Sequence, residues 1–286
     1  MSLLDDFNSF LQQRNYSSYT QRDYLDTVNL WLEFVQSKKL PINDGRYFEV
    51  FLRNRQVSTR TLNHDLSALR TFFRFLEEFK KIPMPREILE VKPKFDSKLP
   101  VFFTVDQINL LLSAPDKLFS EGKIDEFYWR RDKALLELLY GAGIRVGELV
   151  ALRCSDINWS LRQIRVLGKG RKERVIPIGI PALEALKQLH AIQNVPVLIP
   201  RKDGGALTVR SVQLLIKKYL CASKLPLTMT PHSCRHSYAT HMLQNGADVR
   251  AVQELLGHAK LSTTQKYTHV NIHFLQKIYN QSHPQK

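Results

Sequence analysis

The sequence predicts a mainly helical protein of two domains, with a small β-sheet in the second domain. Its 286 residues exceed the usual size of one domain. Apolar residues recur at helical spacing through the first ninety positions. One later stretch, "RQIRVLGKGRKERVIPIG", instead alternates β-branched residues on each side of a basic, glycine-bearing tip, which is typical of a β-hairpin.

Four helices are expected in the first domain, residues 1–92. Each has an apolar face that repeats every three or four residues, and Ser58 or Thr59 suits the N-cap of the last. The expected helices cover residues 3–14, 18–37, 47–53 and 58–79. The stretch "KKIPMPREILEVKPKFDSKLP" has four prolines in twenty-one residues, which makes a poor helix, so we place a linker at residues 93–103.

The second domain, residues 104–286, begins with a helix capped by Thr104 and a second helix ended by Gly141 or Gly143. The predicted hairpin follows at residues 162–179. Further helices are expected at residues 181–192, 208–220 and 232–245, and in a segment that ends at Leu256 with Gly257 as its C-cap. The sequence "STTQ" then forms a capping box for a short helix that carries Tyr267.

Charge is the most informative bulk property. The chain has 42 Lys and Arg against 27 Asp and Glu, a net charge of +15. Residues 1–99 contribute +3 of this excess and residues 100–286 contribute +12. Such an excess favours a polyanionic partner, nucleic acid first, over a basic surface without a partner.

Several features indicate the cytoplasm and a reduced protein. The start, "MSLLDDFNSF", has two aspartates where a signal peptide would have lysine or arginine. The three cysteines are widely spaced and form no CxxC pair, which argues against a disulfide framework or a four-cysteine zinc site. No run approaches ~18 consecutive apolar residues, so no membrane span is expected.

The segment "TPHSCRHSYATHM" concentrates histidine, cysteine and arginine near the start of a predicted helix. His232 and Arg235 are three residues apart and share a face at the helix N-terminus, which favours an anion such as phosphate. A metal could instead use His232 and His236, one turn apart. No acidic residue lies between Thr230 and Gly246, unlike in HExxH metal sites. Phosphate is favoured, with a structural histidine cluster and a metal site as alternatives.

Two further stretches carry candidate residues. In "YGAGIRVGELVAL", glycines around Arg145 let the backbone approach a ligand closely, and Glu148 follows three residues later; the alternative is an ordinary solvated corner. The hairpin sequence is suited to a DNA phosphate backbone, although it could equally be solvated. Its six basic residues are Arg162, Arg165, Lys169, Arg171, Lys172 and Arg174. Taken singly, His258 and Tyr267 would be ordinary surface and packing residues.

Together these segments resemble the tyrosine recombinase (phage integrase) family, and most closely the bacterial Xer site-specific recombinases. The resemblance covers essentially the whole chain. It rests on "GIRVGEL", "GKGRKER", the H-x-x-R box "PHSCRHSYATHML" and "VQELLGHAKLSTTQKYTH", in that order and without a missing element. It implies an N-terminal four-helix core-binding (SAM-like) domain and a mixed α/β catalytic domain.

The resemblance also implies a role for each site residue. Tyr267 would be the nucleophile, and Arg145 and Arg235 would clamp the scissile phosphate. His232 would assist proton movement, His258 would bind the phosphate, Lys169 would be the general acid and Glu148 would orient its neighbours. Arg162, Arg165, Arg171, Lys172 and Arg174 would bind DNA. Two guanidinium groups can supply the charge that a Lewis-acid metal would supply, so no metal or cofactor is expected.

The implied activity is site-specific recombination through a 3′-phosphotyrosine, resolving chromosome or plasmid dimers. Four protomers would assemble on two double-stranded DNA sites, as a homo-tetramer or with a second Xer recombinase, and an FtsK-type translocase is a possible partner. Residues 272–286 would pass to a neighbouring protomer, or else fold onto their own domain. The alternatives are an integrase or transposase of a mobile element, a type IB topoisomerase-like enzyme, and a DNA-binding protein without catalysis.

Overall fold

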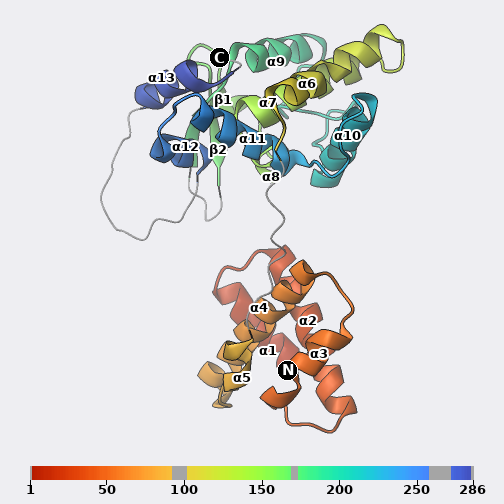
Figure 1. Ribbon diagram of the computed structural model, residues 1–286, viewed down its shortest axis with the longest axis vertical. Helices are drawn as coiled ribbons and strands as arrows, with labels where there is room; N and C mark the ends of the chain where they lie inside the picture. The colour runs from red at the N-terminus through yellow and green to blue at the C-terminus, as the bar shows by residue number, and fades with distance from the viewer. Residues whose placement is uncertain (1, 92–101, 169–172, 258–271, 285–286) are drawn as a thin grey trace. The chain divides into compact units, whose positions relative to one another are not determined.

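The computed structural model describes residues 2–91, 102–168, 173–257 and 272–284. The chain divides into two compact units, Met1–Lys98 and Leu99–Lys286 (Figure 1). The part of the chain that the structure describes contains no helix long and apolar enough to cross a membrane.

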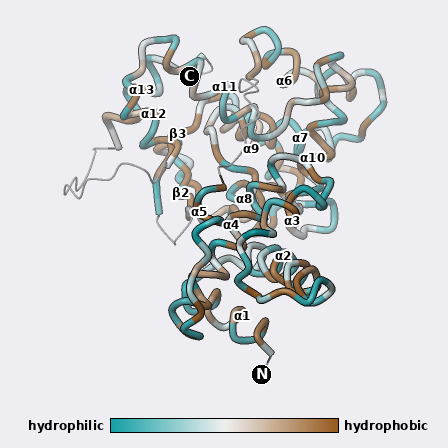
Figure 2. Tube along the Cα trace, turned by 60° about the horizontal axis from the view of Figure 1, so that its bottom comes forward, coloured by the Kyte–Doolittle hydropathy of each residue, from teal (hydrophilic) through white to brown (hydrophobic). Residues whose placement is uncertain are grey.

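Unit 1 is helical throughout, as predicted. Its helices are α1 (Leu3–Gln13), α2 (Ser18–Ser37), α3 (Phe48–Asn54), α4 (Thr59–Phe75) and α5 (Arg86–Glu90), with a 3₁₀ turn at Gly45–Tyr47 and a π-helical turn at Leu76–Lys80. Ser58 caps α4 by accepting a hydrogen bond from the backbone of Thr61, which confirms one of the two predicted N-caps. Apolar and polar residues alternate along these helices, as Figure 2 shows.

Aromatic side chains form the centre of unit 1. Trp31 is fully buried, its ring stacks on Phe48 at 4.6 Å between centroids, and Phe51 and Phe73 meet it edge-on. The indole N–H of Trp31 donates to the carbonyl of Ile42 at 3.0 Å, so the buried ring leaves no unpaired donor. Helices α2, α3 and α4 are therefore fixed to one another through a single residue.

Helix α5 lies in the proline-rich stretch where no helix was predicted, so that expectation was wrong for Arg86–Glu90. Pro85 occupies its N-cap position, and Ile88 is fully buried against unit 1. The guanidinium of Arg70 on α4 donates to the carbonyls of Ile88 and Val91 at 3.0 and 2.7 Å. Tertiary contacts thus stabilise a helix that is too short to form alone.

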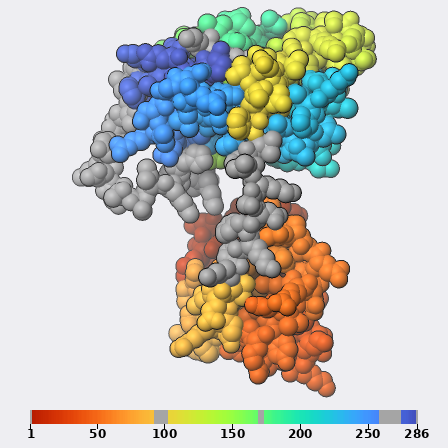
Figure 3. All heavy atoms as spheres, in the orientation of Figure 1, coloured from red at the N-terminus to blue at the C-terminus, as the bar shows by residue number. Residues whose placement is uncertain are grey.

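Unit 2 combines helices with one small sheet, as predicted. Its helices are α6 (Val105–Ser120), α7 (Glu126–Gly141), α8 (Val146–Leu149), α9 (Ile180–Ile192), α10 (Val209–Ala222), α11 (Pro231–Gln244), α12 (Val249–Leu256) and α13 (Ile272–Ser282), with a 3₁₀ turn at Cys154–Asp156. The predicted caps at Thr104 and Gly257 are confirmed. Helix α7 packs against α6, α9 and α11, and α6 and α10 lie side by side on one face (Figure 3).

The sheet has three antiparallel strands, β1 (Ile157–Asn158), β2 (Gln163–Leu167) and β3 (Glu173–Pro177), in that order. Strands β2 and β3 form the predicted hairpin, whereas β1 was not predicted. Val166 pairs with Arg174, and Leu167 with Glu173. Because cross-strand partners share a face, Arg174 lies on the same face as the buried Val166.

The C-terminal helix α13 packs against α11, α12 and β3 of the same chain (Figure 1). Leu275 and Tyr279 are buried in the core of unit 2. In the single chain this helix therefore covers its own domain. The passage of residues 272–286 to a neighbouring protomer stays a prediction.

Candidate active site

Arg145 is positioned by the sharp turn that follows α7. Gly143 has φ +58°, and a Cβ at this position would come within 2.7 Å of the ring of Tyr238 on α11. Only glycine combines this backbone conformation with so close an approach. The turn places Arg145 at the N-cap of α8, where its backbone N–H donates to the Glu148 carboxylate at 2.9 Å.

Arg235 reaches the same turn from α11, and only 3% of the residue is exposed. One terminal nitrogen donates to the carbonyl of Gly143 at 2.7 Å and the other to the carbonyl of Leu256. Burial and then the nearby charge of Arg145 lower the pKa of Arg235 to about 10, so it stays cationic at neutral pH. A buried cation beside a second cation favours the arrival of an anion.

Glu148 lies between two arginines. Its carboxylate accepts from the Arg145 guanidinium at 2.9 Å and from both terminal nitrogens of Arg174, at 2.9 and 2.8 Å. Burial opposes the ionised form, but the hydrogen bonds from Arg174 and from the Arg145 backbone outweigh it and lower the pKa of Glu148 to about 2. Glu148 is therefore a carboxylate at neutral pH and is suited to orienting the two guanidinium groups.

Backbone carbonyls at the C-terminal end of α12 accept hydrogen bonds from Arg145, Arg174 and Arg235. The carbonyl of Leu255 accepts from Arg174 at 3.4 Å, that of Leu256 accepts from Arg235, and that of Gly257 accepts from Arg145 at 3.4 Å. These carbonyls carry the partial negative charge of a helix C-terminus, which stabilises nearby cations. In the sequence, His258 follows directly.

An open hollow of about 590 Å³ lies over these groups. Arg145 and Arg235 line it together with Glu148, the exposed His232 in the first turn of α11, and Gly168 at the end of β2. Arginine donors and a helix N-terminus meet here, a combination that binds phosphate.

The structure thus brings together Arg145, Glu148, His232 and Arg235, which the sequence pointed to from separate segments. Five predicted site residues lie outside the described residues: Lys169, Arg171, Lys172, His258 and Tyr267. Of the other hairpin residues, Arg162 is half-buried, and Arg165 is exposed with its guanidinium 3.6 Å from Asp156.

Arg174 differs from its expected position. We predicted a DNA contact, but its side chain is 14% exposed and its guanidinium binds Glu148 beneath the hollow. A signal for this was present in the sequence: Arg174 is two residues from the buried Ile176, so the strand period places both on the inner face.

The residues that suggested a metal in "TPHSCRHSYATHM" have other environments. Cys234 is buried, and the buried His241 lies with its Nδ1 2.9 Å from the hydroxyl of Tyr140. His236 packs edge-on against Phe102. Among the described residues, no three His, Cys, Asp or Glu side chains come together as a metal site.

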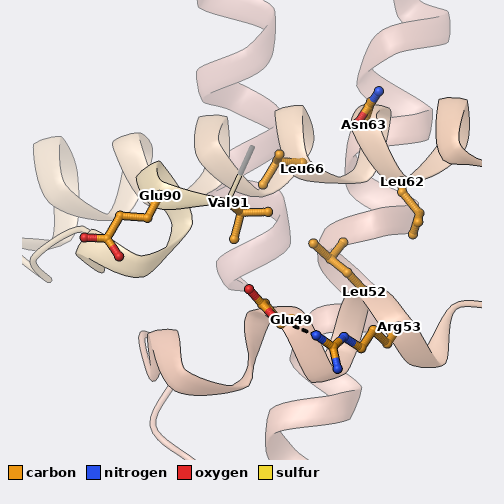
Figure 4. A pocket seen from close by; sticks show the side chains of 8 residues that line it. All are labelled: Glu49, Leu52, Arg53, Leu62, Asn63, Leu66, Glu90 and Val91. Atoms are coloured by element: carbon orange, nitrogen blue, oxygen red, sulfur yellow. Dashed lines mark hydrogen bonds and ion pairs between the residues drawn. The ribbon is translucent and has the colours of Figure 1, made fainter. Parts of the chain in front are cut away.

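A second pocket lies in unit 1 and has a different character (Figure 4). Leu52, Leu62 and Leu66 line it, and Arg53 at its edge is paired with Glu49 at 3.0 Å. Its lining is half apolar and includes two carboxylates, Glu49 and Glu90, and its arginine is paired with one of them. This pocket therefore lacks the converging cations of the hollow in unit 2.

Two family models match the chain. The model described as "Phage integrase family" matches residues 102–273, and "Phage integrase, N-terminal SAM-like domain" matches residues 4–80. The chain belongs to the phage integrase family. The curated relatives of this chain are named tyrosine recombinases, which confirms the resemblance seen in the sequence.

Relatives match along nearly their full lengths. The tyrosine recombinase XerC of Syntrophus aciditrophicus is 36% identical, with 99% of this chain and 97% of the relative covered. XerC of Thermodesulfovibrio yellowstonii is 38% identical over 97% of this chain and 94% of the relative. XerD of Staphylococcus epidermidis is 33% identical over 99% of each.

Solved structures show the same fold. XerH bound to a palindromic difH substrate in a post-cleavage complex has a TM-score of 0.71 and 22% identity, covering 94% of this chain and 83% of that one. A lambda integrase dimer bound to a COC′ core site has a TM-score of 0.69 and 19% identity, covering 94% and 98%. The predicted fold class is therefore confirmed, as is the predicted activity: this phage integrase family member is a site-specific tyrosine recombinase that breaks and rejoins DNA strands.

Glu148→Gln is expected to lower the free energy of unfolding by about 1–2 kcal/mol at pH 7, because the folded-state pKa of Glu148 is about 2 against an ordinary 4.5 and solvent in the open hollow screens part of its ion pairs. A carboxylate whose pKa is lowered by folding stabilises the folded state at every pH above its pKa in the unfolded chain. The difference in free energy of unfolding between wild type and variant should therefore become smaller as the pH falls from about 4.5 towards 2. Urea unfolding at pH 7, 5, 4 and 3 measures it, and a constant difference would contradict the assignment.

Gly257→Ala is expected to destabilise unit 2 by about 2–3 kcal/mol, since it adds a clash to the ~1–2 kcal/mol of left-handed backbone strain. Gly257 has φ +64°, and its added Cβ would lie 2.9 Å from Cδ of Arg174. Gly122→Ala is the matched control, because Gly122 has φ +68° with nothing within 4 Å of the added Cβ. Equal losses in urea unfolding would show that Arg174 does not pack on the end of α12.

Proposed function

We propose that this chain is an Xer-type recombinase that cuts DNA with Tyr267 and forms a 3′-phosphotyrosine. The observation that carries the proposal is the convergence of Arg145 and Arg235 on one hollow, with both guanidinium groups bound to the last carbonyls of α12. Tyr267 follows ten residues after Gly257 in the sequence.

The chemistry follows from the charges of this site. The tyrosine oxygen attacks the phosphorus of a phosphodiester, and negative charge builds on the two non-bridging oxygens. Arg145 and Arg235 stabilise that charge with directed donors, while Glu148 fixes Arg145. Tyrosine has an ordinary pKa of ~10, so the cationic surroundings favour its ionisation, and His232 takes up the proton that the hydroxyl loses. Lys169 donates the proton that the departing 5′-oxygen needs, and His258 binds the phosphate.

Rejoining is the reverse of cleavage. The phosphotyrosine retains the energy of the broken phosphodiester, so the 5′-hydroxyl of a partner strand attacks it without ATP. The tyrosine leaves with a proton returned to its oxygen, and the 5′-hydroxyl proton passes to Lys169. Exchange between two duplexes follows when the attacking hydroxyl comes from the other duplex.

The biological role is the resolution of chromosome or plasmid dimers in the cytoplasm. This part of the proposal is supported by relatives at 33–38% identity that are named XerC and XerD. A homo-tetramer or a tetramer with a second Xer recombinase would act on two DNA sites; a lambda integrase with the same fold was solved as a tetramer bound to a Holliday junction. An FtsK-type translocase would activate the complex. The Tn1549 transposon integrase resembles this chain at 19% identity, which is a likeness of fold alone.

Helix α13 would join the protomers of that tetramer. Its buried residues Leu275 and Tyr279 fill an apolar site on the same chain. Because every protomer carries the same site, a neighbour's α13 can occupy it without new contacts, as in domain swapping. The exposed Arg165 and the half-buried Arg162 would bind the DNA backbone, together with Arg171 and Lys172, which lie outside the described residues.

Covalent trapping tests the function. The DNA site is first selected from host fragments by binding, and a duplex nicked beside the cleavage position is then incubated with the wild type. A protein–DNA adduct that survives denaturant is expected, as is resolution of a plasmid carrying two sites. EDTA should leave cleavage intact, because guanidinium groups supply the charge. Failure to form an adduct on the selected site would contradict the proposal.

A further inference from the structure

Arg174 is the one arginine of the cluster that does not line the hollow. It pairs with Val166 across the hairpin and shares its inward face, whereas Arg165 and Leu167 on the same strand are exposed. Its side chain is 14% exposed. A residue in this position is poorly placed to reach a DNA backbone.

All three nitrogens of the Arg174 guanidinium are engaged. The two terminal nitrogens bind the two oxygens of Glu148 at 2.9 and 2.8 Å, and Nε donates to the carbonyl of Leu255 at 3.4 Å. A planar fork on a carboxylate fixes the plane of that carboxylate, which a single donor would not. Glu148, so fixed, accepts from the guanidinium and the backbone N–H of Arg145.

Arg174 also supports the end of α12. Its stem packs against Gly257 so closely that a Cβ there would lie 2.9 Å from Cδ. The carbonyls of Leu256 and Gly257, in turn, bind Arg235 and Arg145. One side chain therefore contacts both structures that hold the two arginines of the hollow: the Glu148 carboxylate and the carbonyl end of α12.

The electrostatics argue that this contact has a purpose beyond stability. Arg174 adds a third cation beside Arg145 and the buried Arg235, and its charge contributes to the lowered pKa of Arg235. If Arg174 served stability alone, a position farther from the charges of Arg145 and Arg235 would avoid their repulsion. Beneath a site that binds an oxyanion, its repulsion of Arg145 and Arg235 is offset when the anion arrives.

We propose that Arg174 is a positioning residue of the recombination reaction: it orients Arg145 through Glu148, and Arg235 through the end of α12, without touching DNA. The proposal rests on the proposed function, since the oriented groups are those that would bind the scissile phosphate. It replaces the DNA-contacting role first expected for this residue.

Two variants, Arg174→Gln and Arg174→Lys, test the proposal on the full-length protein with the nicked duplex. Both should lower the single-turnover cleavage constant at saturating DNA about 10–100-fold, the usual effect of losing an outer-shell partner. Lysine keeps the charge but loses the fork, so it should not rescue cleavage. DNA affinity, and the slope of its logarithm against the logarithm of salt concentration, should match the wild type.

Arg130→Gln is the matched control, because Arg130 on α7 also binds a glutamate, Glu126, through two nitrogens. It should cleave at the wild-type rate. A salt slope reduced by about one, with unchanged cleavage, would make Arg174 a phosphate contact and overturn the proposal. Unchanged cleavage with an unchanged slope would also overturn it.

A double variant separates positioning from general loss of structure. In the Glu148→Gln background, Arg174→Gln should slow cleavage much less than it does in the wild type, because its principal contact is already altered. Equal slowing in both backgrounds would contradict the route through Glu148. If wild type forms no adduct, the proposed function has failed. Urea unfolding of the wild type, the two single glutamine variants and the double variant then tests the Arg174–Glu148 coupling by itself. Additive changes in the free energy of unfolding would overturn the coupling, and non-additive changes would support it.

Discussion

Tyr267→Phe is expected to abolish the covalent protein–DNA adduct while leaving DNA binding intact. The substitution removes the proposed attacking oxygen and keeps the ring, so the phosphate contacts proposed for Arg145 and Arg235 should be unaffected. Attack by water in place of the tyrosine oxygen would not produce an adduct, because the hydrolysed strand would not be attached to the protein. Denaturing electrophoresis of the nicked duplex with each protein measures the adduct, and a mobility shift under native conditions measures binding.

The other tyrosines near the site do not offer a substitute nucleophile. Tyr140, Tyr238 and Tyr279 are fully buried, and burial raises the pKa of each well above 10. Tyr128, half-buried on α7, serves as the control, and Tyr128→Phe should form the adduct at the wild-type level. An adduct that persists in Tyr267→Phe would show that the nucleophile is a different residue.

Most helices and strands could be predicted from signals between residues close together in the sequence. Ser58, Thr104 and Gly257 were recognised as caps because a capping hydrogen bond or a left-handed C-cap depends on a few neighbouring residues. Helix α5 was missed because its stability depends on Arg70, sixteen or more residues away, and on burial of Ile88. A five-residue helix has no local signal strong enough to outweigh three nearby prolines.

The site was predicted by residue type but not by contact. Sequence pattern identified Arg145, Glu148 and Arg235, yet the groups that hold them include the backbone carbonyls of Gly143 and Leu256, and a carbonyl has no sequence signature. The buried position of Arg174 was not predicted, for a different reason. A run of basic residues suggested an exposed tip, and the strand period that turns Arg174 inward was outweighed by composition.

Arg235→Ala is expected to slow cleavage at saturating DNA by about 10²–10³, the effect of removing one donor worth some 2.7–4 kcal/mol from an oxyanion site. DNA affinity should change little, because Arg235 would be only one of several proposed contacts to the DNA backbone. Arg235→Lys should be nearly as slow. An ammonium cannot bridge the carbonyls of Gly143 and Leu256 while also facing the hollow, whereas a planar guanidinium can.

Single-turnover cleavage of the nicked duplex, with urea unfolding in parallel, separates chemistry from folding. Removing a buried cation relieves its repulsion with Arg145 and Arg174 but leaves two carbonyls without their charged donor. The opposing effects should keep the stability loss below the 2.7–4 kcal/mol lost from the transition state. If Arg235→Ala cleaves saturating DNA at the wild-type rate, Arg235 is a structural residue that joins α11, α12 and the turn after α7, and the phosphate clamp must be sought elsewhere.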